Sequence, residues 1–211
     1  GGASAINTST GFIAECARSF WTPTVLDSYW AFRPQGTCLT ANTDVSNTPD
    51  GNIVEKGAQA YKLRSTTTRT VKTCSTCANN SALLNFDNTT VTQAMLGAAS
   101  TTERDALINW SRGIDMDDEN INGIMDGTGA SPNNVAEMRP SAHGDVVHSR
   151  PVAINYAATD LDPPQVVVFY GGNDGVLRAI NGNRDSGLTF GGKAPGMEFW
   201  AFVAPEFYSK I

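Results

Sequence analysis

Apolar and polar residues alternate with a strand-like period at both ends of the chain and with a helical period in its middle. Within residues 1–80 the alternating runs FIAECA, AYKLRS and RTVKTC are separated by Asn, Thr, Pro and Gly, which predicts short strands joined by turns. Between residues 91 and 112 the apolar spacing is helical, so we expect a short helix and then a longer one at about 100–110.

The last third of the chain has the strongest strand pattern. Segments 145–154, 165–170, 176–180 and 197–203 are strand candidates, and the Gly- and Asp-rich turn 171–175 joins the second to the third. Four successive antiparallel strands correspond to one blade of a β-propeller, which closes only with at least about four blades. The sequence therefore predicts about one blade of an incomplete propeller.

An isolated blade leaves apolar side chains on both of its faces without a neighbouring sheet. We therefore expect the protein to continue past Ile211; the alternative is a compact α+β unit in which the blade packs on the N-terminal region. The side chains concerned are Val167, Phe169, Leu177, Phe199, Trp200 and Phe202.

These patterns predict a mainly β fold with minor α content, in three parts. Residues 1–90 form a β-rich N-terminal region, and residues 91–143 form a helical segment with an acidic loop and a linker. Residues 144–211 form an antiparallel sheet equivalent to the first propeller blade. The linker is expected because Ser131-Pro132 and Arg139-Pro140 disfavour regular structure.

Composition narrows the range of partners. The net charge is −6 and no run of Lys or Arg is present, which argues against nucleic-acid binding. The chain has no transmembrane segment, since no stretch approaches the roughly 18 apolar residues that a membrane helix requires. It begins Gly-Gly-Ala, without Met or an apolar signal core, so we expect a processed or excised piece.

The four cysteines are compatible with two disulfides in an oxidising compartment. Three pairings are possible; we favour Cys16 with Cys38 and Cys74 with Cys77. The alternatives for the C-x-x-C pair are less well supported, because Ala78 replaces the His of a haem attachment site and no second C-x-x-C completes a zinc site. A thioredoxin-like pair would also need a strand-then-helix pattern around it.

The segment DENINGIMD, residues 118–126, spaces oxygen ligands as a calcium loop does. Side-chain oxygens stand at positions one, three, five and nine, Gly123 stands at the sharp turn of position six, and position seven offers a backbone carbonyl. No basic residue lies within DMDDENINGIMDG. We therefore expect Ca²⁺ to bind here, with ligands Asp118, Asn120, Asn122, Ile124 and Asp126.

A second frame starts at Asp115 and fits less well, because it places Asn120 where the loop needs glycine. The preferred frame departs from the helix-loop-helix signature at position twelve, where Gly129 replaces glutamate, so a bidentate ligand would have to be Asp126. The other interpretation is a solvated acidic loop without metal.

Catalysis is not expected. His143, His148 and Asp145 are close in sequence, but His148 and Asp145 would point to opposite faces of a strand, and no G-x-S-x-G motif presents a serine. A quinoprotein-like propeller enzyme would need a full ring of blades to enclose its cofactor.

Five motifs in order resemble the PilY-type family of type IV pilus biogenesis and tip-associated adhesin proteins. They cover about residue 51 to the end, whereas the first fifty residues resemble no known family. The motifs are EKGAQAYKLR, RDALINWSRGID, RPSAHGDVVHSRPVAINY, VVVFYGGNDGVLRAING and EFWAFVAPEFY.

The resemblance implies a non-catalytic protein of a Gram-negative bacterium that is exported through the periplasm to the pilus tip or outer membrane surface. It implies roles in pilus biogenesis, surface attachment and twitching motility, with minor pilins or other pilus tip components, host or abiotic surfaces and the rest of its own propeller as partners. Family members carry a modified β-propeller that begins at the region matching Gly144, and calcium binding in their C-terminal part regulates pilus extension and retraction. In this chain the calcium-type loop precedes the propeller motif.

Overall fold

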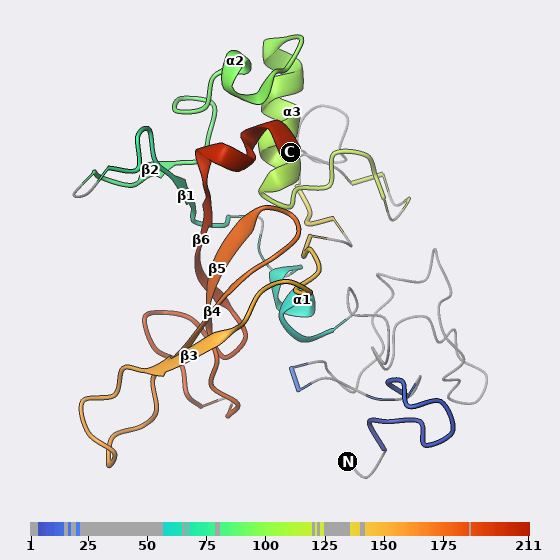
Figure 1. Cartoon of the computed structure of the whole chain (residues 1–211), viewed down its shortest axis with the longest axis vertical. Coiled ribbons are helices and arrows are strands. Elements are labelled where there is room, and N and C mark those ends of the chain that lie inside the picture. The colour runs from blue at the N-terminus through green and yellow to red at the C-terminus, as the bar shows by residue number, and fades with distance from the viewer. Residues whose placement is uncertain are drawn as a thin grey trace.

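The protein is built around one mixed β-sheet. The computed structural model describes residues 4–14, 17, 20–21, 57–64, 66, 68–78, 81–119, 121, 123–124, 136–139, 142–185 and 187–211. Within these residues six strands form a sheet of order β2-β1-β6-β5-β4-β3 (Figure 1). The strands are β1 (Val71–Thr73), β2 (Leu84–Asn85), β3 (Val152–Asn155), β4 (Val166–Gly171), β5 (Val176–Asn181) and β6 (Glu198–Val203).

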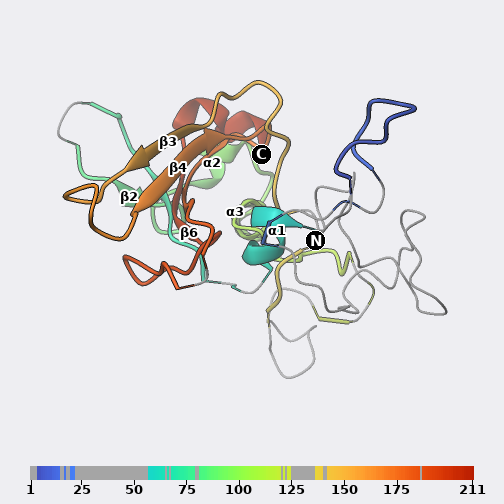
Figure 2. The same cartoon turned by 90° about the horizontal axis from the view of Figure 1, so that it is seen from below.

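The helices are short and are grouped around the sheet. Figure 1 shows α2 and α3 together at one end of the molecule, with the C-terminal 3₁₀ helix η4 between them and the sheet. The turned view in Figure 2 again places α1 beside the sheet. The helices are α1 (Ala58–Leu63), α2 (Gln93–Leu96), α3 (Thr101–Ser111) and η4 (Pro205–Lys210). The expected fold class, mainly β with minor α, is therefore confirmed at this level.

Strands β3 to β6 form an antiparallel meander in chain order, as the alternating pattern predicts. The turn between β4 and β5 closes through the Gly172 N–H, which donates to the Val176 carbonyl at 3.0 Å, and Gly175 adopts a φ of +73°. Strand β3 begins only at Val152, later than the expected 145–154, because Pro151 has no N–H to donate to a ladder. Ser149 instead accepts the Gly171 N–H through its Oγ at 2.9 Å.

The sheet also contains strands from the N-terminal part of the chain. Strand β1 pairs in parallel with β6, with Val71 opposite Ala201, and β2 pairs antiparallel with β1. Residues 136–139, next to the expected linker, also pack closely: Met138 is 1% exposed and Arg139 is 6% exposed. This stretch is held in place by backbone pairing with the residues after α3.

The prediction of a strand for AYKLRS was wrong, because Ala58–Leu63 forms the helix α1. Ala60 and Leu63, three residues apart, are buried on one face, and Leu63 packs with Ile114, Met138 and Ala142. Ala, Gln, Lys and Leu are also good helix formers. Of the FIAECA run, Ile13 makes a single bridge to Ile6.

The main core lies between the sheet and the α2, α3 and η4 group. Its central members are fully buried, and Phe86 and Tyr208 bring their ring centroids to 5.7 Å. Other members include Val71, Val91, Leu96, Ile108, Val176, Ala201 and Val203. Of the apolar side chains expected to be uncovered, Val167 is 8% exposed and Leu177 is 41% exposed. Among the described residues, no helix has the length and apolar character needed to cross a membrane.

The disulfide between Cys74 and Cys77 is present as expected, directly after β1. The expected partners Cys16 and Cys38 lie outside the described residues.

Candidate functional site

Helix α3 leads directly into the acidic loop, as its sequence predicts. Ser100 caps the helix by accepting the Glu103 N–H at 3.1 Å, and the helix ends at Ser111 before the left-handed Gly113, whose φ is +90°. The chain then turns into residues 115–119. The end of α3 therefore fixes where the acidic loop starts and the direction in which the chain enters it.

The two ends of the loop region are clamped together by backbone hydrogen bonds. Asp115 donates its N–H to the Glu137 carbonyl at 2.9 Å, and Arg139 donates its N–H to the Gly113 carbonyl at 2.8 Å. Ile114 and Met138 form the bridge between these two bonds. The segment between residues 116 and 136 consequently starts and ends at one point of the structure.

Asp115 organises the start of the loop from a fully buried position. Its carboxylate accepts the Asp117 N–H at 3.2 Å and the Glu119 N–H at 3.0 and 2.9 Å, and its exposed fraction is 0%. Burial raises the pKa of this carboxyl group, while the two backbone donors oppose that change. Asp115 therefore holds the start of the loop by accepting two of its backbone N–H groups.

Asp118 closes the turn that the preferred calcium frame requires. The Gly123 N–H donates to both Asp118 carboxylate oxygens, at 3.0 and 3.1 Å, and Gly123 has a φ of +79°. The Ile121 N–H donates to the Asp118 carbonyl at 3.0 Å. Asp118 and Ile121 both adopt left-handed backbone angles, with φ of +51° and +57°, and Ile121 is 78% exposed. A β-branched residue in this region is strained, so the surrounding turn must hold it there.

Two of the five expected calcium ligands can be located. Asp118 and Ile124 belong to the described residues, whereas Asn120, Asn122 and Asp126 lie outside them. The described part of the chain contains no cluster of three or more His, Cys, Asp or Glu side chains. An ionised carboxylate offers about four lone-pair directions, so one carboxylate can accept a backbone N–H and also bind a metal ion. In the frame that starts at Asp118, the bonded pair Asp118 and Gly123 stands at positions one and six, and Ile124 follows at position seven.

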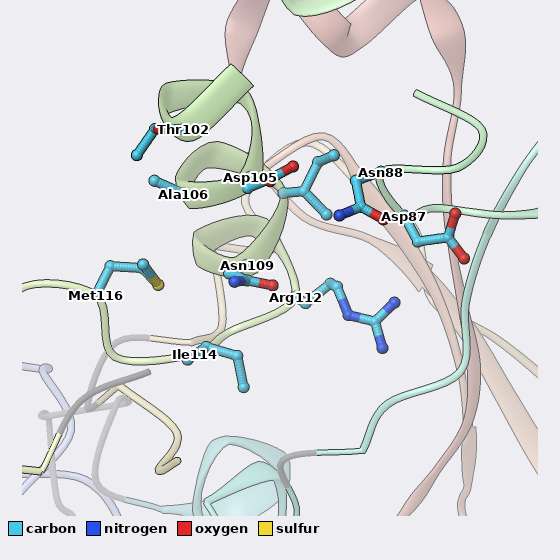
Figure 3. A pocket seen from close by; sticks show the side chains of 10 residues that line it. Asp87, Asn88, Thr102, Asp105, Ala106, Asn109, Arg112, Ile114 and Met116 are labelled. Atoms are coloured by element: carbon cyan, nitrogen blue, oxygen red, sulfur yellow. The ribbon is translucent and has the colours of Figure 1, made fainter. Parts of the chain in front are cut away.

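A polar cavity of about 780 Å³ lies beside the loop and was not indicated by any sequence motif. Figure 3 shows Asp105 and Asn109 of α3 facing it, with Asp87 and Asn88 on one side and Met116 on the other. Arg112, the positively charged residue in its lining, donates to the Phe86 carbonyl at 3.1 Å and to the Arg69 carbonyl at 3.2 Å. Burial lowers the pKa of Arg112, with Arg69 adding to the effect.

Sequence analysis also did not predict a buried network of charged side chains centred on Arg178 of β5. Arg178 is 0% exposed and is paired with Asp174, and its Nε lies 3.7 Å from a Glu198 oxygen. Burial is the largest influence on Asp174, but the Arg178 hydrogen bond and charge outweigh it and lower the Asp174 pKa. The Asp and Arg of this pair are four residues apart, which is the only local signal that could have suggested it.

Two side chains of the stretch considered for nucleophilic chemistry, His143 and Ser149, are bonded to residues of strand β4. His143 bonds the Tyr170 hydroxyl through Nε2 at 2.7 Å, while His148 and Asp145 are exposed. Ser149 is engaged by the backbone of Gly171.

Comparison with known proteins found no matching family model, no matching curated protein and no matching solved structure.

Proposed function

We propose that residues 118–126 form a calcium loop in a non-catalytic segment of a type IV pilus tip-associated adhesin and assembly factor. The hydrogen bond from Gly123 to Asp118 carries the calcium part of the proposal, because it closes the turn between positions one and six of the preferred frame. The pilus part is supported by the five motifs that resemble the PilY-type family.

The ligands in this proposal are the side chains of Asp118, Asn120, Asn122 and Asp126 and the carbonyl of Ile124. Ca²⁺ would supply a hard positive charge that neutralises the local acidic residues Asp115, Asp117 and Glu119. Two carboxylates and two amides suggest an extracellular-range affinity of roughly 10⁻⁵ to 10⁻³ M.

The clamped ends of the loop give calcium a structural consequence. Residues 113–115 and 137–139 are joined by backbone bonds, and Leu63 of α1 packs against Ile114 and Met138. Calcium bound between these two segments would therefore stabilise the point where α3, α1 and the chain entering the sheet meet. Under this proposal, β3–β6 would serve as the first blade of a propeller.

A melting experiment tests calcium binding. With CaCl₂ about a hundredfold above the dissociation constant, the chain should gain roughly 2.7 kcal/mol relative to EGTA. Asp118→Asn and Asp126→Ala should lose most of this gain. Asp118→Asn is the sharper variant, because the remaining amide oxygen can still accept the Gly123 N–H while the ligand charge is removed.

Asp160→Ala is the matched control, since it removes an exposed carboxylate far along the chain from the loop and should keep the full calcium response. An equal melting temperature in CaCl₂ and EGTA for the unaltered chain would instead support the alternative function, a calcium-independent structural spacer whose acidic loop holds no metal. Magnesium at the same concentration should stabilise less, because it demands stricter octahedral geometry.

The pilus role requires a separate measurement in the bacterium that encodes the chain. Cells producing the Asp118→Asn protein should show fewer surface pili or reduced twitching, while Asp160→Ala cells should resemble the parent. Normal pili and motility in cells lacking the protein altogether would contradict the pilus role even if calcium binding holds. Quinone-dependent dehydrogenase activity in the complete protein would favour the quinoprotein-like alternative.

A further inference from the structure

The disulfide between Cys74 and Cys77 closes a short loop at the end of strand β1. Cys74 follows directly after Thr73, the last residue of β1. Strand β2, which comes after this loop, pairs with β1 and forms the edge of the sheet, as Figure 1 shows. The disulfide therefore belongs to the connection between β1 and the edge strand.

The Cys74 end of the disulfide is fixed to the sheet. Cys74 is 4% exposed, and Thr73 is 0% exposed. Oγ1 of Thr73 donates to the Val203 carbonyl at 2.8 Å and is also hydrogen-bonded to the Tyr208 hydroxyl. The backbone at Cys74 is thus held in place by β1 as well as by the disulfide, and its side chain is shielded from solvent.

The Cys77 end has no comparable support. Cys77 is exposed, as are Ser75 and Thr76 before it. Within the described part of the chain these three residues make no hydrogen bond, so the disulfide is the bond that holds them. Cys77 also has a left-handed φ of +49°, which is unfavourable for a residue other than glycine. Opening the disulfide would let this backbone relax without the loss of a hydrogen bond in the loop.

These properties favour reduction of the disulfide in the folded protein. The bond encloses four residues, so it restricts the unfolded chain less than a bond across a long loop does. Exposed disulfides, and those that hold a strained chain, are the more readily reduced class, whereas buried structural disulfides resist reduction. The exposure of Cys77 and its left-handed backbone act in the same direction.

We propose that the Cys74–Cys77 bond is a reversible thiol–disulfide exchange site at which a dithiol reductant attacks the sulfur of Cys77. A thiolate of the reductant bonds to Sγ of Cys77, and the bond between the two cysteines breaks as its electron pair passes to Sγ of Cys74, which takes up a proton. The second thiolate of the reductant then attacks the first reductant sulfur and releases Cys77, which is protonated in turn. The reductant gives up two electrons and two protons and leaves as a disulfide.

Reduction would loosen the connection between β1 and β2 and leave the rest of the sheet in place. Strand β2 is only Leu84–Asn85, and Leu84 is 37% exposed. Phe86 is 0% exposed and donates its N–H to the Val71 carbonyl at 2.9 Å, so it retains the chain after β2. The expected loosening covers residues 75–78 and 81–85. The site depends neither on calcium nor on the pilus proposal.

A redox titration tests reducibility on the unaltered chain. The chain is equilibrated with glutathione buffers of graded thiol-to-disulfide ratio, with and without urea, and free thiols are then blocked with N-ethylmaleimide. Trypsin releases residues 73–104 as a peptide that contains this pair and no other cysteine. Because folding and a structural disulfide stabilise each other, folding favours a typical structural bond roughly thirtyfold or more. Here folding should favour the bond by less than about fivefold, and a larger ratio would overturn the proposal.

Hydrogen exchange shows where reduction acts. With the pair reduced, amides of residues 75–78 and 81–85 should exchange faster, while those of β5 and β6 keep their protection. The double variant Cys74→Ser/Cys77→Ser should give the same pattern without any reductant. Failure of this double variant to fold, or loss of protection throughout β5 and β6 on reduction, would mean that the disulfide is structural and the proposal is wrong.

A matched pair of single variants tests which sulfur is accessible. Cys74→Ser leaves the thiol of Cys77, and Cys77→Ser leaves that of Cys74. Reaction with a nitrobenzoate disulfide reagent, followed on the tryptic peptide 73–104, should be at least about tenfold faster for the thiol of Cys77, because that residue is exposed. Equal rates would rule out Cys77 as the sulfur that is attacked.

Discussion

Arg69 and Glu198 form a doubly hydrogen-bonded ion pair inside the protein, although 129 residues separate them. Nε and Nη2 of Arg69 donate to the two Glu198 oxygens at 2.9 and 2.8 Å, and the two side chains are 1% and 4% exposed. Nη1 of Arg69 also donates to the Arg112 carbonyl at 3.0 Å. The pair therefore joins the residues before β1, the first residue of β6 and the end of α3.

Replacing Arg69 with Met should strongly destabilise the fold. Among the described residues, the change leaves the buried Glu198 carboxylate with Arg178, at 3.7 Å, as its cationic neighbour. We expect a loss of about 3 kcal/mol in the free energy of unfolding, measured by urea denaturation. The matched control is Arg104→Met, whose pairing with Asp105 is partly exposed and should contribute less than about 1 kcal/mol. Equal effects of the two substitutions would contradict the assigned role of the buried pair.

Gly113, at the junction between α3 and the acidic loop, should accept a side chain only at a cost in stability, because its φ is positive and the buried Met138 must shift to make room. An added Cβ would overlap the Met138 side chain and lie 3.2 Å from the Ala142 Cβ, at a φ of +90°. Gly113→Ala should therefore lower the free energy of unfolding by roughly 2–4 kcal/mol, combining left-handed strain with overpacking.

Gly97→Ala isolates the strain component of this prediction. Gly97 also has a positive φ, +66°, but nothing lies within 4 Å of its added Cβ. Its substitution should cost about 1–2 kcal/mol. Urea midpoints of the two variants should differ clearly, and a Gly97 effect as large as that of Gly113 would rule out the contact with Met138 as the cause.

The two carboxylates at the start of the loop should respond differently to amide substitution, if the calcium proposal is correct. Asp115→Asn keeps an acceptor for the Asp117 and Glu119 amides and should retain most of the calcium stabilisation. Asp118→Asn should lose it. Asp115→Ala should lower stability by about 1–3 kcal/mol with or without calcium, because two backbone donors lose their acceptor. Loss of the calcium response in Asp115→Asn alone would favour the frame that starts at Asp115.

The buried His143 should make the protein less stable as the pH falls from about 6.5 towards 4. Its folded pKa, lowered to about 4 mainly by burial, lies below the ordinary value of 6.5. The unfolded chain therefore binds the extra proton first, and stability contributed above pH 6.5 is lost progressively down to pH 4. The loss should be on the order of 2–3 kcal/mol relative to a His143→Gln variant over the same pH range.

A direct titration tests the same group. The chain has two histidines, so His148→Asn leaves His143 as the sole imidazole signal in an NMR titration. That signal should titrate near pH 4 while the protein is folded. A midpoint near 6.5 in the folded state would show that the imidazole is accessible to solvent.

The local sequence pattern was enough to predict the strands and helices that have long apolar repeats or clear capping and turn residues. Strands β4, β5 and β6 follow apolar runs of strand length, and α3 follows a helical repeat with Ser100 as its cap. Over six residues, however, the AYKLRS pattern suits a strand or a short helix equally well. The burial of Leu63 against Met138, which is distant in sequence, selects the helix.

The contacts in the candidate site and the core also fall into those that the sequence determines and those that only the tertiary structure decides. The amino-acid sequence alone determined the spacing of Asp118 and Gly123 and the Cys74–Cys77 pair, because each involves residues within one turn of chain. Tertiary structure decided the Arg69–Glu198 pair and the meeting of Gln59 with Tyr170, 111 residues apart. Contacts of this kind depend on which distant segments share the sheet and its core, and the free energy that selects that arrangement is spread over the whole fold rather than carried by any local pattern.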